Sequence, residues 1–450
     1  MEGMVPDSTT LVIVGGTQSD ICGFTPALAR IATVPAALRI VLSAHSLKVN
    51  RTILCVESLS AARIETQMRR TGRAPKSLEW YTYFDTFDLG NLIRDVGVGG
   101  KLILVMGNQA YQPSLLRKPA AWKKSDGVLA FTSDSGLAGI YVLSLPVALK
   151  LAQDRNRRIG TLEGLHDWAE GHTHVECEHV DDQSWQQISS LADLPKAEAK
   201  LNTWLVKATD GLFARMNRKV SIPISRWLLR WPITPNMVTL FTLWVSFGAG
   251  LFFAYGGYLA TLVGAALSVW ASILDGCDGE IARLKLQVTD FGCWLETVCD
   301  YLYYVFVFGG MIIGFTRTMG AKFTLTWGPM LLFGAIASFL AVGFARHHFS
   351  KDRPEAFLSV WQGKAEKRTT NPLLYVGRHC EFIIRRCFLP YAFLFFALVN
   401  VLPYAFVATA IGANIVWCIA LYSCFTLSRN RELKTSVRPV VTSGSSPATI

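Results

Sequence analysis

The pattern of hydrophobic and polar residues changes near residue 230. Before that point, short apolar runs alternate with mixed segments, including a helical stretch interrupted by Pro35. The apolar runs that read as buried strands are TTLVIVGG, RTILCVES, GKLILVMGN and LAGIYVLS, the last followed by a helix. Strands that alternate with helices are typical of an α/β domain with a parallel sheet. We expect such a domain, Rossmann-like in its fold, over residues 1–199.

Beyond residue 230 the apolar runs approach the length of about 20 residues that a helix needs to cross a bilayer. They predict six spanning helices in an all-α membrane domain over residues 233–430. The expected spans are 237–256, 257–274, 291–315, 326–345, 387–402 and 403–427. Lys and Arg are concentrated in the loop 346–386 and after residue 427. Because basic loops stay in the cytosol, both termini are predicted to be cytosolic in an inner membrane.

Two further segments border the predicted membrane domain. In residues 200–232, Trp, Leu and Phe alternate with Arg and Lys, as in amphipathic helices that lie in the membrane interface. Pro223, Pro232 and Pro235 are expected to break this segment, and a simple basic linker is the alternative. Residues 431–450 are rich in Ser, Pro and Thr and are predicted to be disordered.

Charge and cysteine content narrow the class of protein. The net charge of +11 comes from basic residues that cluster beside the apolar runs, where anionic lipid headgroups would meet them. No basic stripe interleaved with aromatic residues is present, so a nucleic-acid partner is not expected. Ten cysteines without CxxC spacing indicate a reducing compartment, and the N-terminus lacks the pattern of a secretory signal. We expect the first domain to stay in the cytosol.

Acidic residues interrupt the apolar runs in ILDGCDGEIARLKLQVTDFGCWLETVCD, residues 273–300. Asp275 and Asp278 lie three apart, and Glu296 and Asp300 lie four apart, so each pair shares one face of a helix. A turn between the two helices would bring these faces together near the cytosolic surface. Four converging carboxylates repel one another unless a cation neutralises them. Mg²⁺ or Mn²⁺ prefers such oxygen ligands, shared with substrate phosphates.

Small residues and one cation accompany the acids. Gly276, Gly279 and Ala282 leave room for a ligand beside the helix backbone, and Arg283 is suited to bind phosphate. Together with a metal cluster, they predict chemistry on a diphosphate. The alternative is a non-catalytic membrane protein, in which the acids form a structural polar network or an ion-transport site.

The spacing matches the signature D-x2-D-G-x2-A-R-x8-G-x3-D-x3-D, and residues 220–430 resemble the CDP-alcohol phosphotransferase family. The matching residues are Asp275, Asp278, Gly279, Ala282, Arg283, Gly292, Glu296 and Asp300. Glu296 departs from the signature, which has Asp there, and its extra methylene adds about 1.5 Å of reach. The departure puts activity at risk at this one position.

The resemblance implies an enzyme of phospholipid biosynthesis type that transfers a phospho-alcohol group from a CDP-alcohol to a second alcohol and releases CMP. It also implies two divalent metal ions, a homodimer and Asp300 as the base. The implied metal ligands are Asp275, Asp278, Glu296 and Asp300, and the implied CDP contacts are Asp275, Gly279, Ala282 and Arg283. The acceptor would be a lipid or an inositol phosphate-like alcohol.

Basic residues near the fourth and fifth predicted spans are candidates to bind an acceptor phosphate. They are Arg346, His347, Lys351, Arg353 and Arg378. The alternative is that they are only the positive charges that flank cytosolic helix ends.

The N-terminal half resembles a sugar nucleotidyltransferase domain. Its fusion to the membrane domain resembles the bifunctional enzymes that combine inositol-1-phosphate cytidylyltransferase with di-myo-inositol phosphate phosphate synthase. However, the glycines Gly15 and Gly16 are not followed by the expected basic residues, and Asn108 stands where that family has a metal-binding Asp. Because an amide is a poor Mg²⁺ ligand, we predict a degenerate domain with a structural or regulatory role. The alternative is a bifunctional enzyme that also makes CDP-inositol.

Overall fold

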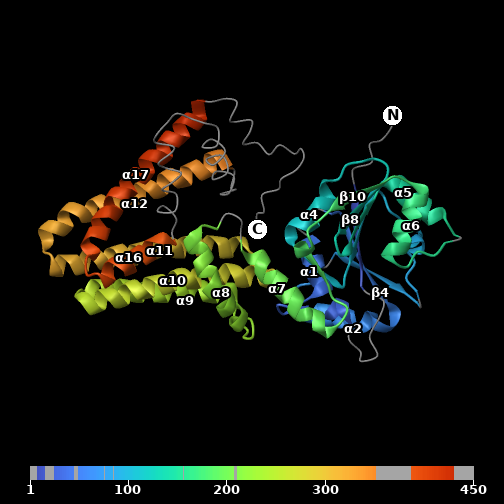
Figure 1. Cartoon of the computed structure of the whole chain (residues 1–450), viewed down its shortest axis with the longest axis horizontal. Helices are drawn as coiled ribbons and strands as arrows, with labels where there is room; N and C mark the ends of the chain where they lie inside the picture. Colours follow the sequence, from blue (N-terminus) through green and yellow to red (C-terminus); the bar gives the residue numbers. More distant parts are fainter. Residues whose placement is uncertain are drawn as a thin grey trace. The chain divides into compact units, whose positions relative to one another are not determined.

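A computed structural model describes residues 8–15, 25–44, 49–75, 77–84, 86–155, 157–206, 210–350 and 387–429 (Figure 1). The chain divides into two compact units. The N-terminal domain comprises Met1–Leu205 with Leu284–Leu286, and the helical domain comprises Val206–Arg283 and Gln287–Ile450. The division after Leu205 lies beyond the predicted boundary at residue 199, because helix α7 (Leu194–Leu205) belongs to the N-terminal domain.

The N-terminal domain is built on a seven-stranded sheet with the order β10-β8-β9-β6-β1-β4-β5. The strands are β1 (Thr9–Val14), β4 (Arg51–Glu57), β5 (Leu78–Tyr83), β6 (Lys101–Met106), β8 (Val128–Ser133), β9 (Gly136–Leu143) and β10 (Val175–His179). Strands β1, β4, β5 and β6 are parallel, as predicted, but β9 runs antiparallel to both β6 and β8. The sheet is therefore mixed, which a strand pattern alone does not reveal.

Helices cover both faces of this sheet, and the side chains of each strand alternate between the two cores. In β1, Leu11 and Ile13 face one core, while Val12 and Val14 face the other. The first core holds α1 (Ala36–Ala44), α2 (Ser58–Arg70) and α4 (Pro113–Ala121); the second holds α3 (Leu89–Val96), α5 (Leu145–Gln153) and α6 (Leu162–His172). A strand buried on both faces reads as a continuous apolar run, which explains why the sequence located these strands.

The predicted helical stretch before residue 46 is only partly helical. A 3-10 turn η1 (Pro26–Leu28) leads into a hairpin of β2 (Arg30–Ile31) and β3 (Val34–Pro35), and α1 follows. Ala32 and Thr33 take positive φ angles of 47° and 73° at the hairpin turn. Pro35 favours extended backbone at Val34, so the helix begins only after the proline.

Smaller elements complete the N-terminal domain. Strand β7 (Gln109–Tyr111) pairs with β11 (Trp185–Gln187), and the 3-10 turns η3 (Asp182–Ser184) and η4 (Leu191–Asp193) precede α7. In β7, the Tyr111 hydroxyl donates to the carbonyl of Gly139, 3.1 Å away. These contacts fix the residues that follow β6, where Asn108 lies.

The helical domain consists, in the described residues, of long apolar helices and one amphipathic helix. They are α8 (Leu212–Leu228), α9 (Pro235–Tyr255), α10 (Tyr258–Leu284), α11 (Asp290–Thr318), α12 (Ala321–Ser350), α16 (Phe388–Leu398) and α17 (Leu402–Arg429). Four of them, α9 to α12, contain segments long and apolar enough to cross a membrane. This is an integral membrane domain.

The prediction of six spans is not supported beyond these four. Helix α16 has 11 residues and is shorter than the predicted span 387–402, whereas α17 has 28 residues and contains the predicted span 403–427, with side chains described without interruption over Leu402–Cys418. At 1.5 Å per residue, α16 is about 16 Å long, roughly half the hydrocarbon thickness of a bilayer. Helix α10 continues to Leu284, past the predicted membrane span 257–274, so the first two acids lie within the same helix as the apolar run.

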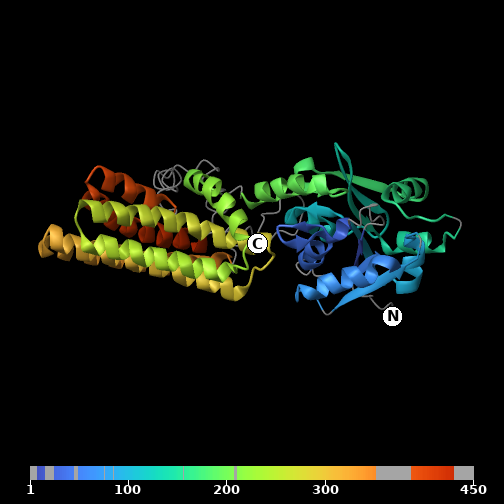
Figure 2. The same cartoon turned by 90° about the horizontal axis from the view of Figure 1, so that it is seen from below.

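Close backbone contacts hold the long helices side by side (Figure 2). Between α9 and α11, a Cβ at Gly310 or Gly314 would overlap the carbonyl oxygen of Gly250 or Phe253. Small residues at such crossings allow two helices to approach closely in a membrane. Helices α12 and α17 are joined differently, because the Asn414 side-chain amide donates to the carbonyl of Met330 at 2.9 Å.

Candidate active site

The four acids lie on the helical hairpin formed by α10 and α11. Asp275 and Asp278 are in the last turns of α10, whereas Glu296 and Asp300 are in the N-terminal part of α11. Thr289 caps α11, and its hydroxyl accepts a hydrogen bond from the Gly292 backbone N–H at 3.0 Å. The short connection between the helices therefore brings both pairs of acids to the same end of the hairpin, as the spacing predicted.

Asp278 lies at the centre of this group. Its side chain is 4% exposed, and the hydroxyl of Thr239 on α9 donates to its Oδ2 atom at 2.6 Å. Its Oδ1 atom accepts from the Gly279 N–H at 2.5 Å. The charges of Asp275 and Glu296 both act on this buried carboxylate. Three of the four predicted acids are thus near one another, and three helices contribute to their surroundings.

The fit of these acids to a metal ion depends on their chemistry. Among the described residues, no three Asp, Glu, His or Cys side chains already enclose a point at ligand distance. Carboxylates repel one another, so such a cluster closes only around a cation that neutralises it. A buried carboxylate with two acidic neighbours is the donor set that hard divalent cations prefer. The residues fit a divalent metal by chemical type.

The motif glycines have different neighbours from those that the sequence suggested. A Cβ at Gly276 would lie 3.4 Å from Nη1 of Arg218 and from the hydroxyl of Ser221, both on α8. Gly276 therefore allows α8 to pack against α10, and does not face open space for a ligand. A Cβ at Gly279 would lie 3.3 Å from Nη1 of Arg283 on the same helix.

Arg283 has unsatisfied hydrogen-bond donors. Its Nε and Nη2 atoms are buried and have no hydrogen-bond partner. Buried polar groups are almost always paired in folded proteins, so exceptions need an explanation. An anionic ligand would supply the missing acceptors, and a guanidinium binds phosphate oxygens with two parallel hydrogen bonds. Arg283 is thus a candidate anion-binding residue beside the acids.

A buried ionic network links α10 to α8, and the sequence analysis missed it. Glu280 is fully buried and accepts from Arg218 Nη1 at 2.6 Å, from Ser221 at 2.5 Å and from Ser225 at 2.6 Å. Burial lowers the pKa of the Arg218 guanidinium, but the hydrogen bond and charge of Glu280, together with Asp210, raise the pKa above its usual value. The sequence does carry a signal for this network: the polar residues Asn217, Ser221 and Ser225 lie four apart, and therefore on one face of α8. We had interpreted this segment as a membrane-surface helix.

The prolines in and after α8 do not all break the helix, although the sequence had predicted that they would. Pro223 lies inside α8, so the prediction that it breaks the helix is wrong, whereas Pro235 begins α9. Pro223 is exposed on α8. Asn217 is buried at the other side of the helix and donates to the carbonyl of Ser272 on α10 at 3.3 Å. The contacts of that polar face hold α8 in place across the proline.

The predicted acceptor residues fall where the structure gives no side-chain positions. Lys351, Arg353 and Arg378 lie outside the described residues. Arg346 and His347 belong to the last turns of α12, and their side chains are also outside the described part. Their role therefore stays a prediction, as does the disorder expected for residues 431–450, which are likewise outside it.

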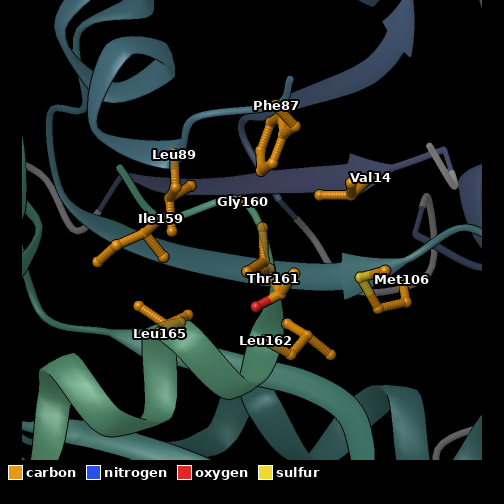
Figure 3. Close-up of a pocket in the computed structure, with 10 residues that line it drawn as sticks. Val14, Phe87, Leu89, Met106, Ile159, Gly160, Thr161, Leu162 and Leu165 are labelled. Carbon is orange, nitrogen blue, oxygen red and sulfur yellow. The ribbon is translucent and has the colours of Figure 1, made fainter. Parts of the chain in front are cut away.

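A small pocket in the N-terminal domain lies beside β1 and β6 (Figure 3). Its walls are apolar, and its one polar side chain is Thr161, whose hydroxyl accepts from the Gly164 N–H at 3.1 Å. No Lys or Arg lines it, so the lining has no charge for a nucleotide phosphate. Asn108, which follows β6, has a buried side-chain oxygen without a hydrogen-bond partner. Gly16 lies outside the described residues.

The acid cluster lies in a segment that matches a known protein family. Residues 232–371 match the family model described as CDP-alcohol phosphatidyltransferase. This segment is a CDP-alcohol phosphatidyltransferase domain. The phosphatidyltransferase domain contains all four acids and Arg283, while Arg218 and the rest of α8 precede the matched residues.

Curated relatives resemble part of the chain. A protein of Aquifex aeolicus named "Bifunctional IPC transferase and DIPP synthase" is 37% identical over 128 residues, which is 28% of this chain and 29% of the relative. A protein of the same name from Rubrobacter xylanophilus is 30% identical over 203 residues, 44% of each chain. The alignments thus span less than half the length of these relatives.

Solved structures resemble the chain at low sequence identity. The inositol-1-phosphate CTP transferase from T. maritima is 14% identical, with a TM-score of 0.34. The alignment covers 43% of this chain and 96% of that structure.

Proposed function

We propose that this protein is a membrane phosphotransferase that moves a phospho-alcohol group from a CDP-alcohol to a second alcohol and releases CMP. The observation that carries the proposal is the buried carboxylate of Asp278, with the charges of Asp275 and Glu296 acting on it. On the same helix, Arg283 has buried donors without partners. The family match over residues 232–371 supports the same reaction class.

The proposed roles follow from the chemistry of each side chain. Asp275, Asp278, Glu296 and Asp300 would hold divalent cations, two Mg²⁺ or Mn²⁺ ions in our proposal, which supply charge neutralisation at the diphosphate. Arg283 would bind diphosphate oxygens, with Gly279 and Ala282 beside it and Asp275 near the CDP moiety. Such groups lower the barrier by stabilising the charge that develops on the phosphoryl oxygens.

The transfer itself exchanges one bond to phosphorus for another. The acceptor hydroxyl oxygen attacks the phosphorus that carries the donor alcohol, and the bond from that phosphorus to the CMP oxygen breaks. Asp300, which is half-buried on α11, would take the proton of the attacking hydroxyl as the general base. CMP leaves with the bonding electrons, so atoms and charge balance.

The topology and the partners belong to the same proposal. We place both termini and the active site on the cytosolic side of the membrane, because Lys and Arg concentrate around residues 346–386 and after residue 427. The acceptor would be a lipid or an inositol phosphate-like alcohol, with Arg346, His347, Lys351, Arg353 and Arg378 as candidate contacts. We also propose a homodimer within a lipid bilayer, by resemblance to the family.

The test is a screen of the full-length protein against CDP-linked donors and alcohol acceptors, scored by release of CMP. We expect CMP release with at least one donor in Mg²⁺ or Mn²⁺, and its loss when EDTA removes the metal. If no donor gives CMP, an ion-binding or transport role for the acid cluster replaces this proposal.

A further inference from the structure

Glu280 and Arg283 are three residues apart on α10, a spacing at which opposite charges on a helix usually attract and pair. In this structure Glu280 is paired elsewhere. Its Oε1 atom accepts from Arg218 Nη1 at 2.6 Å and from Ser221 at 2.5 Å, and its Oε2 atom accepts from Ser225 at 2.6 Å. All three donors belong to α8.

Arg283 is left without this neighbour as a partner. Its Nε and Nη2 atoms are buried and unpaired, although the charges of Arg218 and Glu280 both act on it. A carboxylate that is fully buried must find a partner, because an unpaired buried charge is strongly destabilising. If Arg218 were absent, the nearest remaining cation for Glu280 on its own helix would be Arg283.

Several contacts fix Arg218 in its present position. Its Nε atom forms an ion pair with Asp210 at 3.4 Å, and its Nη1 atom donates to the carbonyl of Gly276 at 3.3 Å. One residue earlier, Asn217 accepts from the hydroxyl of Tyr391 on α16 at 2.6 Å. Helix α8 thus presents the Arg218 guanidinium to Glu280 in one orientation.

We propose that Arg218 is a positioning residue of the donor site: it engages Glu280 and so keeps the Arg283 guanidinium free to bind the diphosphate of the CDP-alcohol. This inference rests on the proposed function. Helix α8 lies outside the matched family segment, and the inference gives it an influence on substrate binding that acts through Glu280 and Arg283.

The experiment measures the KM for the CDP-alcohol donor and kcat in CMP release by purified full-length variants. Arg218→Met should raise the KM of the donor by about tenfold or more, as expected when a charged hydrogen bond to the ligand is lost, and should change kcat less. The double variant Arg218→Met/Glu280→Gln should return the KM to within about threefold of wild type, because the competing carboxylate is gone. Glu280→Gln alone should also keep a KM near that of wild type.

A matched control is Ser338→Ala, which removes a partly buried interhelical hydrogen bond to the carbonyl of Ala413 away from the network. Its KM should equal that of wild type. Calorimetric titration of each variant with CDP in Mg²⁺ should reproduce the order of the KM values without turnover. If Arg218→Met does not fold, Arg218→Gln, which removes the charge but keeps a hydrogen-bond donor, takes its place, and an unchanged KM in that variant would overturn the positioning role.

The outcomes separate this inference from the proposed function. A double variant as impaired as Arg218→Met, an unchanged KM in Arg218→Met, or a raised KM in Glu280→Gln would overturn the positioning role while CMP release by wild type upholds the proposed function. Absence of CMP release by wild type would overturn both.

Discussion

Asp278 shows how a charged residue is accommodated in an apolar helix. Moving a carboxylate out of water costs several kcal/mol even after the protein relaxes. Hydrogen bonds from Thr239 and Gly279 offset part of that cost, but the charges of Asp275 and Glu296 add to it. Under the proposed function, a divalent cation would remove this repulsion.

Glu296 allows the metal-ligand role to be tested. Glu296→Asp restores the residue of the family signature and keeps a carboxylate, so we expect CMP release within about tenfold of wild type. Glu296→Gln keeps the size but removes the charge, and we expect a loss of about 100-fold or more with a higher Mg²⁺ requirement. The measurement is CMP release as a function of Mg²⁺ concentration. Collapse of Glu296→Asp alone would contradict the ligand role.

The sequence placed each pair of acids on one helix because their spacing is a property of a single helix. The partners of Glu280 were not predictable in this way. They lie 55 to 62 residues earlier in the chain, and nothing local indicates which helix packs against α10. Glu280 occupies a variable position of the signature, so the signature does not indicate a role for it; its partners follow only from the packing of α8 against α10.

At the scale of elements, backbone contact between helices decides the geometry. Helix α11 approaches α9 through Gly310 and Gly314, and α8 approaches α10 at Gly276. The apolar runs predicted the existence of α9 to α12, because length and hydropathy are local. The predicted span ended at residue 274, where the charges of the motif interrupt the apolar run, and the helix continues to Leu284, as the helical spacing of Asp275 and Asp278 implied.

Two neighbouring glycines provide a matched test of this packing. A Cβ at Gly310 would overlap the backbone of Gly250, whereas a Cβ at Gly309 meets nothing within 4 Å. Gly310→Ala should therefore destabilise the domain by about 1–3 kcal/mol through overpacking. Gly309→Ala should leave stability unchanged or raise it slightly, since alanine favours helix. Thermal unfolding in detergent compares the two; equal midpoints would contradict the close α9–α11 contact.

At the scale of the whole molecule, an α/β domain precedes a membrane domain, and the sequence pattern predicts different features of each. Strands β1, β4, β6 and β9 were predicted because both faces of the sheet are buried, whereas β5, β8 and β10 were not predicted. The antiparallel direction of β9 and the hairpin at Ala32 and Thr33 were not predicted. Strand direction and positive φ angles at non-glycine residues leave no pattern in a single sequence. The predicted fifth span, 387–402, is longer than α16, whereas the predicted sixth span, 403–427, lies within α17.

The N-terminal domain gives a prediction of its own. Residue 108 is Asn where the sequence resemblance implies a metal-binding Asp, and the pocket beside β1 and β6 has no basic residue in its lining. The full-length protein, incubated with CTP, Mg²⁺ and inositol phosphate or a sugar phosphate, should therefore release no diphosphate above background. Diphosphate release would show that the domain is an active cytidylyltransferase and would favour the bifunctional alternative.

The most direct test of the central claim is metal-dependent release of CMP by the full-length protein, compared with Asp300→Asn. Asparagine keeps the size of the side chain but cannot accept the proton of the acceptor hydroxyl. The account predicts that wild type releases CMP from a CDP-alcohol in Mg²⁺ and that Asp300→Asn is slower by about 100-fold or more. Equal rates of CMP release in the two proteins would contradict the assignment of the active site.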